Sequence, residues 1–200
     1  MKSRITSILF TIVMLDLLGF GIILPILPIL FLKTQFHVEL LQQLFPNVNQ
    51  EYILYGIIVA AYPFSQFFSA PILGQLSDKY GRKKLLFYCL AVTSASYFMA
   101  VLGIRQLNFS LLLLSRILGG LMGGNIAIAQ AVAADITEKK DRTRVYGLLG
   151  AAFGIGFILG PYIGGKLSDS NLVSWFQIDT PFLMAGFLSL ISVIVTLLLL

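Results

Sequence analysis

Long apolar stretches separated by short polar connections form the dominant pattern along the chain. A helix needs about 20 apolar residues to cross the roughly 30 Å hydrocarbon core of a bilayer. Stretches of about that length with few charges occur at residues 5–32, 52–76, 85–104, 109–134, 145–166 and 181–200. We therefore expect an all-α integral membrane protein whose six transmembrane helices form one bundle over residues 1–200.

The composition supports a membrane protein rather than a soluble one. Hydrophobic residues make up 58% of the chain, which includes 16 phenylalanines, and the mean hydropathy is +0.90. A soluble core cannot bury this much apolar surface, so we expect the lipid bilayer to cover the rest. Lys2 and Arg4 precede the first apolar stretch as in a signal peptide. That stretch is too long for one and lacks a small-residue cleavage site, so it is predicted to be an inserted helix.

The basic residues lie mainly on one side of the predicted membrane. Ten of them fall at the N-terminus and in two connections: Lys2, Arg4, Lys79, Arg82, Lys83, Lys84, Lys139, Lys140, Arg142 and Arg144. The other side has only Lys33, Arg105 and Lys166. Because cytoplasmic connections carry an excess of Lys and Arg, the N-terminus is predicted to be cytoplasmic. The net charge of +5 follows from this topology and predicts no nucleic-acid partner.

Residues that usually carry catalysis or bind metals are scarce in this sequence. His37 is the one histidine and Cys89 is the one cysteine, so neither a structural metal site nor an intrachain disulfide is expected. The sequence contains no recognisable nucleophile with its base and no phosphate-binding glycine loop. We therefore expect neither an enzyme nor a bound cofactor.

Two ionisable residues interrupt the apolar stretches. Asp16 lies near the middle of the first stretch and Arg116 lies in the fourth. An ionisable group inside a membrane is costly unless it faces a cavity or a partner. Asp16 is therefore a candidate for taking up and releasing a proton, although backbone or hydroxyl donors could instead hold it as a structural group. Arg116 is either a functional group or a side chain that extends to the outer face.

Polar and small residues follow one face of the fourth stretch. From Arg116 this face runs at steps of four, three, four and three through Gly120, Gly123, Ala127 and Gln130. The small residues allow close helix contact. Three amides are candidates for lining a passage through the membrane, or for bonding a neighbouring helix: Gln66, Asn125 and Gln130.

The connection GQLSDKYGRKK, residues 74–84, gathers charges and glycines. A signal that only fixes topology needs the basic residues but not Asp78, Gly74 or Gly81. Asp78 and Arg82 are four residues apart and can form an ion pair if the second helix continues to its end. Gly74 would allow a neighbouring helix to approach closely.

Glycines recur along the fifth stretch at spacings that bring helix backbones together: Gly150, Gly154, Gly156, Gly160 and Gly164. They indicate either ordinary packing or an interface that opens and closes. Pro161 is expected to kink this helix, and Pro25 and Pro28 to bend the outer half of the first. PYIGGKLSD at 161–169 echoes PILGQLSD at 71–78 on the opposite predicted side of the membrane, as an inverted repeat of three helices would.

Three stretches resemble a known family. The spacing G-x-L-x-D-x-x-G-R-K resembles the signature loop of the major facilitator superfamily and is carried by Gly74, Leu76, Asp78, Gly81, Arg82 and Lys83. GIGFILGPYIGG is similar to the glycine-proline motif of the drug:proton antiporter branch, which is carried by Gly156, Gly160, Pro161, Gly164 and Gly165. MLDLLGFGIILPILP resembles that branch's first helix. The resemblance covers nearly the whole chain and looks closest to the tetracycline exporters.

This resemblance implies a transporter of twelve helices in two halves, with the substrate passage between them. The chain would then be the N-terminal half, and its partner would be a missing C-terminal half; a six-helix protein that dimerises is the alternative. In the family pattern Asp16 and Arg116 are linked to proton coupling, and Asp135 joins Asp78 and Arg82 in a charge cluster. The resemblance implies that this cluster latches the two halves on the cytoplasmic side in the outward-facing state.

One residue departs from the tetracycline exporters. Their third helix carries an acidic residue where this chain has Ser96, so tetracycline itself is not expected as the substrate. The resemblance implies proton-coupled efflux of a small amphipathic compound by alternating access, in the inner membrane of a bacterium. An importer or exporter of a specific metabolite or metallophore is the alternative, and a membrane scaffold without transport is another.

Overall fold

The computed structural model describes residues 2–33, 36 and 49–199, and every regular element in those residues is helical. The elements are α1 (Lys2–Ile23), α2 (Ile26–Lys33), α4 (Gln50–Tyr80), α5 (Arg82–Arg105), α6 (Phe109–Met122), α7 (Asn125–Ile136), the short 3₁₀ helix η1 (Lys139–Asp141), α8 (Arg142–Leu167) and α9 (Thr180–Leu199). His37 lies outside the described residues.

The described residues contain six segments that are long and apolar enough to cross a membrane. They are Ile5–Leu32, Gln50–Tyr80, Arg82–Arg105, Phe109–Ile136, Lys139–Leu167 and Thr180–Leu199. The predicted all-α fold with six transmembrane helices is therefore confirmed.

Two of the six segments are interrupted helices. The first changes from α1 to α2 at Leu24 and Pro25, where proline lacks the backbone N–H that a continuous helix would use. The fourth segment, predicted as a span over residues 109–134, consists of two helices: the chain leaves α6 at Gly123 and Gly124 and resumes as α7. The helix α8, in contrast, runs unbroken through Pro161.

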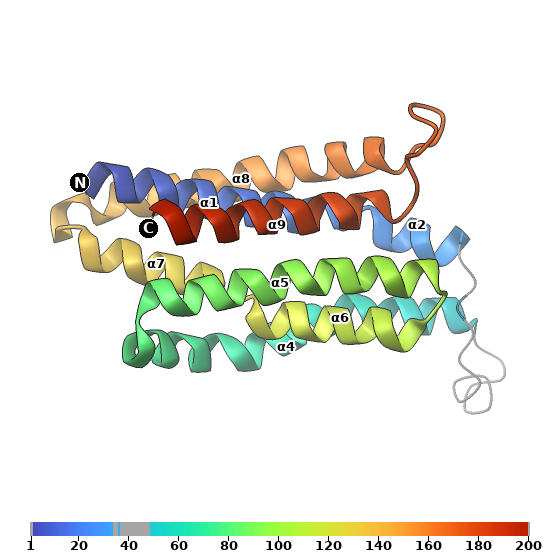
Figure 1. The fold of residues 1–200 in the computed structure, drawn as a ribbon, viewed down its shortest axis with the longest axis horizontal. Helices are drawn as coiled ribbons and strands as arrows, with labels where there is room; N and C mark the ends of the chain where they lie inside the picture. Colours follow the sequence, from blue (N-terminus) through green and yellow to red (C-terminus); the bar gives the residue numbers. More distant parts are fainter. Residues whose placement is uncertain (1, 34–35, 37–48, 200) are drawn as a thin grey trace.

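The helices lie roughly alongside one another along the long axis of the molecule (Figure 1). Both termini, the α4–α5 turn and the α7–α8 junction lie together at one end, which we call the basic end because residues 79–84 and 139–144 carry most of the basic side chains. The connection from α8 to α9 lies at the other end (Figure 1). PILGQLSD therefore falls near the basic end and PYIGGKLSD at the opposite end, which is the placement that an inverted repeat requires.

Glycines set the contact between α1 and α8. A methyl group added at Gly160 would lie 2.6 Å from the Cα atom of Gly21, and one added at Gly21 would lie 2.6 Å from the carbonyl oxygen of Gly156. Gly164 is confined in the same way by the backbone of Ile22. Such spacing leaves no room for side chains, so the two backbones pack directly against each other.

Only some of the recurring glycines of α8 contact α1. Gly156, Gly160 and Gly164 follow one another at steps of four and face α1, whereas a methyl group added at Gly150 or Gly154 would meet no atom within 4 Å in the described part of the chain. The same holds for Gly165 and Gly74. The expected close neighbour at Gly74 is therefore not found among the described residues, where no helix covers that side of α4.

Polar contacts join α5 to α9 at several depths. Ser94 Oγ and Ser189 Oγ each donate to a backbone carbonyl of the facing helix, at 2.9 and 3.1 Å. Arg105 Nε lies 2.6 Å from Asp179 Oδ2, and the Asp179 side chain is only 4% exposed. These contacts hold the two helices together through the membrane segment and at the end opposite the basic end.

Candidate functional site

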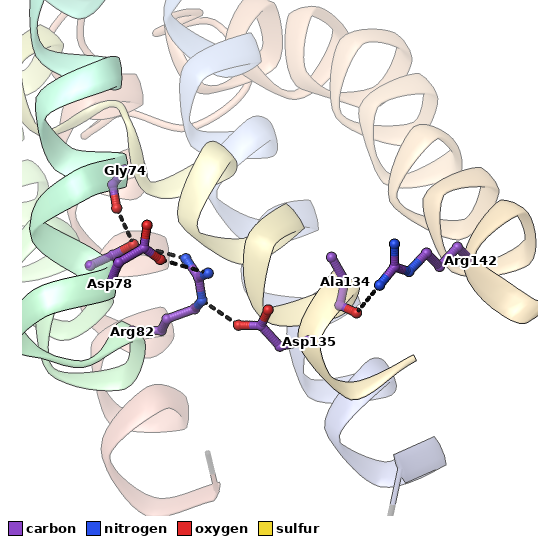
Figure 2. Close-up of polar contacts among 7 residues, drawn as sticks. Gly74, Asp78, Arg82, Ala134, Asp135 and Arg142 are labelled. Carbon is purple, nitrogen blue, oxygen red and sulfur yellow. Dashed lines mark hydrogen bonds and ion pairs between the residues drawn. The ribbon is translucent and has the colours of Figure 1, made fainter. Parts of the chain in front are cut away.

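At the basic end, one arginine joins the α4–α5 turn to α7 (Figure 2). Arg82 Nη2 lies 2.7 Å from Asp78 Oδ1, and Arg82 Nε donates to Asp135 Oδ2 at 2.5 Å. Arg82 Nη1 donates to Ser77 Oγ at 3.0 Å, and that hydroxyl donates to the Gly74 carbonyl oxygen at 2.6 Å. The Arg82 guanidinium thus contacts two carboxylates and one hydroxyl. We call Asp78, Arg82 and Asp135 the charge cluster.

The turn at Gly81 makes this geometry possible. The helix α4 ends at Tyr80 and α5 begins at Arg82, so Asp78 and Arg82 belong to different helices. Gly81 has a φ of 95°, a backbone conformation that glycine adopts without the penalty of a Cβ atom. The ion pair therefore forms across a turn, and not along one continuous helix as the spacing alone suggested.

Two neighbouring basic side chains bind elsewhere. Lys83, predicted as part of the same motif, donates to the Leu197 carbonyl oxygen of α9 at 3.2 Å. Arg142 of α8 donates to the Ala134 carbonyl oxygen near the end of α7 at 3.2 Å (Figure 2). This contact of Arg142 was not predicted from the sequence; the one available signal was a cation close in sequence to a helix C-terminus, where unpaired carbonyls favour positive charge.

A cavity of about 370 Å³ lies between α1, α4, α7 and α8. Its wall carries four polar side chains and three phenylalanine rings: Asp16, Tyr62, Gln66, Gln130, Phe20, Phe153 and Phe157. Of the three predicted amides, two line this cavity and the third, Asn125, does not. The cavity thus combines an apolar aromatic surface with a carboxylate and two amides.

Asp16 is buried and incompletely bonded. Its side chain is 7% exposed, and its Oδ1 atom has no hydrogen-bond partner among the described residues. Asn125 is its hydrogen-bonding neighbour, and both line a second, smaller void against α5. Asn125 Oδ1 also lacks a partner among the described residues. Unpaired buried acceptors are costly, so a proton or another donor bound at this point would relieve the cost.

The break between α6 and α7 places Asn125 beside Asp16. Gln66 Nε2 donates to the Gly123 carbonyl oxygen at 2.6 Å, which gives one carbonyl at the break a partner. Gly123 and Gly124 themselves line the cavity. Irregular backbone at membrane depth is tolerated where it is buried in protein or lines a cavity, and both conditions hold here. Gln66 therefore bonds a neighbouring helix and lines the cavity at the same time.

Arg116 is buried away from this cavity. Its side chain is 4% exposed, and the guanidinium carbon lies 5.5 Å from the ring centroid of Tyr97 and 5.4 Å from that of Phe182. Aromatic faces attract a cation at such distances. Arg116 does not extend to the outer face, and its Nη2 atom has no hydrogen-bond partner among the described residues. The structure therefore separates Arg116 from the cavity wall on which Asp16 lies.

Ser96, the position that departs from the tetracycline exporters, is also buried. It is 2% exposed and donates to the Thr93 carbonyl oxygen at 2.7 Å. A methyl group added at Gly119 would lie 2.9 Å from its hydroxyl oxygen, so Ser96 packs against α6 and is not among the residues that line the cavity. Among the described residues, no group of three or more His, Cys, Asp or Glu side chains lies close enough to hold a metal ion.

The six-helix bundle defines a multi-pass membrane protein, and comparison with known proteins identifies its family. The model of the major facilitator superfamily matches residues 9–200, so the chain belongs to this superfamily of membrane transporters. The chain is 35% identical over 197 residues to the class H tetracycline resistance protein of Pasteurella multocida, with 98% of this chain and 44% of that protein covered. It is 37% identical over 168 residues to the class D protein of Salmonella ordonez, with 84% and 39% covered.

A solved structure shows the same architecture. The crystal structure of the human organic anion transporter MFSD10 (TETRAN) matches with a TM-score of 0.78 at 25% sequence identity, over 99% of this chain and 47% of that one. The chain therefore spans less than half the length of these relatives, and it corresponds to roughly their N-terminal half.

Proposed function

We propose that this chain forms the N-terminal six-helix half of a proton-coupled exporter that moves a small amphipathic compound by alternating access. The observation that carries the proposal is the cavity whose wall combines Asp16, a carboxylate with an unpaired Oδ1 atom, with aromatic rings and amides. Aromatic and amide groups suit a compound with apolar and polar parts. A carboxylate inside the membrane is stabilised when it binds a proton or a cationic group, so substrate and proton can compete for Asp16.

The proposal places the protein in the inner membrane of a bacterium with the basic end in the cytoplasm. The concentration of basic residues at that end supports this orientation. A C-terminal six-helix half would complete the passage from the other side. The tetracycline resistance proteins among the relatives support export, whereas Ser96 argues against tetracycline as the compound.

A carrier of a specific organic metabolite is the second candidate. The similarity to a structure described as an organic anion transporter favours it. The direction of flux in everted vesicles separates the exporter from an importing metabolite carrier, because an exporter loads such vesicles when a proton gradient is applied and an importer does not.

The complete gene product, expressed in a host without its own exporters, is expected to confer resistance to at least one amphipathic compound of a broad panel. The same compound should accumulate in everted vesicles and leave them when an uncoupler collapses the proton gradient. Resistance to nothing, together with substrate uptake by intact cells, would contradict export and support the metabolite carrier. Neither resistance nor uptake would indicate a membrane scaffold.

We further propose that the charge cluster latches the two halves at the cytoplasmic side in the outward-facing state. Arg82 already holds the α4–α5 turn against α7 through Asp135, and the space beside Gly74 stays open in the described chain. A helix of the second half would fit against that open side of α4. The charge cluster would then hold the α4–α5 turn and α7 in a fixed position relative to this helix.

Asp78→Asn in the complete gene product is expected to favour the state that is open to the cytoplasm. The substitution removes one of the two carboxylates that hold Arg82, and because Asp78 is 64% exposed the pair contributes at most about 1 kcal/mol. Cysteine probes on the cytoplasmic side should become up to about five-fold more reactive, and transport should fall by a similar factor. Lys140→Gln breaks an exposed pair at the same end and serves as the control. Unchanged probe reactivity and transport in Asp78→Asn would rule out the latch.

A further inference from the structure

A groove of about 430 Å³ lies at the basic end, where α5 begins and α9 ends. Three basic residues, two aromatic rings and a leucine line it together with Gly81: Arg82, Lys83, Lys84, Phe87, Tyr88 and Leu197. None of these described lining residues is acidic. The groove thus joins a positively charged rim to an apolar floor and is separate from the cavity beside Asp16.

The three basic side chains of the rim differ in the partners that they already have. Arg82 is held by two carboxylates and a hydroxyl, so its charge already has acidic partners. Lys83 donates only to the carbonyl oxygen of Leu197, a neutral group. Lys84 is exposed and forms no hydrogen bond or ion pair with any residue in the described part of the chain. Two adjacent ammonium groups therefore lack an acidic partner, which leaves a net positive site.

An exposed apolar track continues from this groove along α9. Leu197 is 57% exposed, Ile194 48%, Leu190 40% and Phe187 53%. These residues are three or four positions apart, so they lie on one face of the helix. Tyr88, which is 52% exposed, stands at the level of the lysines on α5, where an aromatic ring with a polar hydroxyl suits the boundary between lipid and water.

We propose that this groove binds one anionic phospholipid, with its phosphate between Lys83 and Lys84 and an acyl chain along the exposed face of α9. The acidic group complements two lysines that lack an acidic partner among the described residues, and the acyl chain covers apolar surface that begins where the charges end. Anionic lipids of the cytoplasmic leaflet attract basic residues next to transmembrane helices. The inference rests on the proposed orientation of the basic end, and it is independent of the transported compound.

Binding of phosphatidylglycerol to the complete gene product in detergent, followed by native mass spectrometry, tests this site. Each lysine near an anionic headgroup contributes about five-fold to the affinity, so Lys83→Gln with Lys84→Gln should weaken the tightest bound lipid by roughly 25-fold. Phosphatidylcholine should bind weakly to both proteins. Lys139→Gln with Lys140→Gln removes the same charge at the same end, where neither lysine lines the groove, and should leave the tightest bound lipid unchanged.

Three results would overturn the proposal. Equal weakening by both pairs of substitutions would indicate non-specific attraction to the basic end. Binding of glycerol phosphate as tightly as the lipid would show that no acyl chain is recognised. Protection of Lys84 from an amine-reactive reagent without lipid would show that another segment of the protein covers the groove. Lys84→Gln alone removes a side chain with no contact in the described chain, so its expected five-fold loss can be measured even if the double variant misfolds.

Discussion

Asp16→Asn is expected to reduce resistance to the level of cells that lack the protein, while the variant still accumulates in the membrane. Asparagine has almost the same shape as aspartate but cannot take up or release a proton. Its amide can also donate a hydrogen bond to the unpaired Oδ1 atom of Asn125, so the fold should not be weakened. Everted vesicles that carry the variant should show no substrate accumulation driven by a proton gradient.

Two further variants make this result specific. Asp16→Glu keeps a carboxyl group at the cavity and should retain part of the proton-driven transport. Asp141→Asn removes an exposed carboxylate at the basic end and should leave transport unchanged. Proton-driven accumulation that persists in Asp16→Asn would place the coupling group elsewhere in the protein. A large fall in the melting temperature of Asp16→Asn would instead indicate that Asp16 is a structural group.

The six membrane helices could be predicted from the sequence because a long apolar segment in a bilayer adopts few structures other than a spanning helix. The break between α6 and α7 could not. A glycine costs a helix only about 1 kcal/mol, so a Gly-Gly pair is compatible with both a continuous and a broken helix. At the break, Gln66, which lies 57 positions earlier, supplies the donor for the Gly123 carbonyl oxygen. No local pattern contains that information.

The candidate site also combines features that the sequence predicted with features that it did not. Asp16 could be singled out because a carboxylate in an apolar stretch is rare. The position of Asn125 next to Asp16 could not be predicted, because Asn125 begins α7 after a break that the sequence did not indicate. The contact between Arg82 and Asp135 followed the family pattern, whereas its geometry required the positive φ of Gly81. Arg116 was singled out by the same reasoning as Asp16. Its burial against two aromatic rings depends on how α5 and α9 pack, which periodicity does not reveal.

The glycines of α8 were predicted to bring helix backbones together, and the structure divides them between two faces. Gly156, Gly160 and Gly164 pack on α1 within this chain, which favours ordinary helix packing for these three glycines. Gly150 and Gly154 face away, and within the described residues nothing covers them. We infer that an interface that moves during transport would use the face of Gly150 and Gly154.

Gly160→Ala is therefore expected to destabilise the protein strongly, whereas Gly154→Ala, on the same helix, is not. The added methyl group at Gly160 would lie 2.6 Å from the Gly21 backbone, which cannot move aside as a flexible side chain could. Forcing α1 and α8 apart should cost about 1–3 kcal/mol. At Gly154 the methyl group meets open space, and the higher helix propensity of alanine makes the change neutral or stabilising by up to about 1 kcal/mol.

Thermal melting of the two variants in detergent, monitored by fluorescence-detected size exclusion, measures this difference directly. Gly160→Ala should melt well below the wild type and Gly154→Ala at or above it. The comparison is independent of transport, because it depends only on the α1–α8 contact within the described chain. Equal melting temperatures for the two variants would mean that α1 and α8 do not pack through Gly21 and Gly160. The part of the cavity wall that α1 and α8 form would then have a different arrangement.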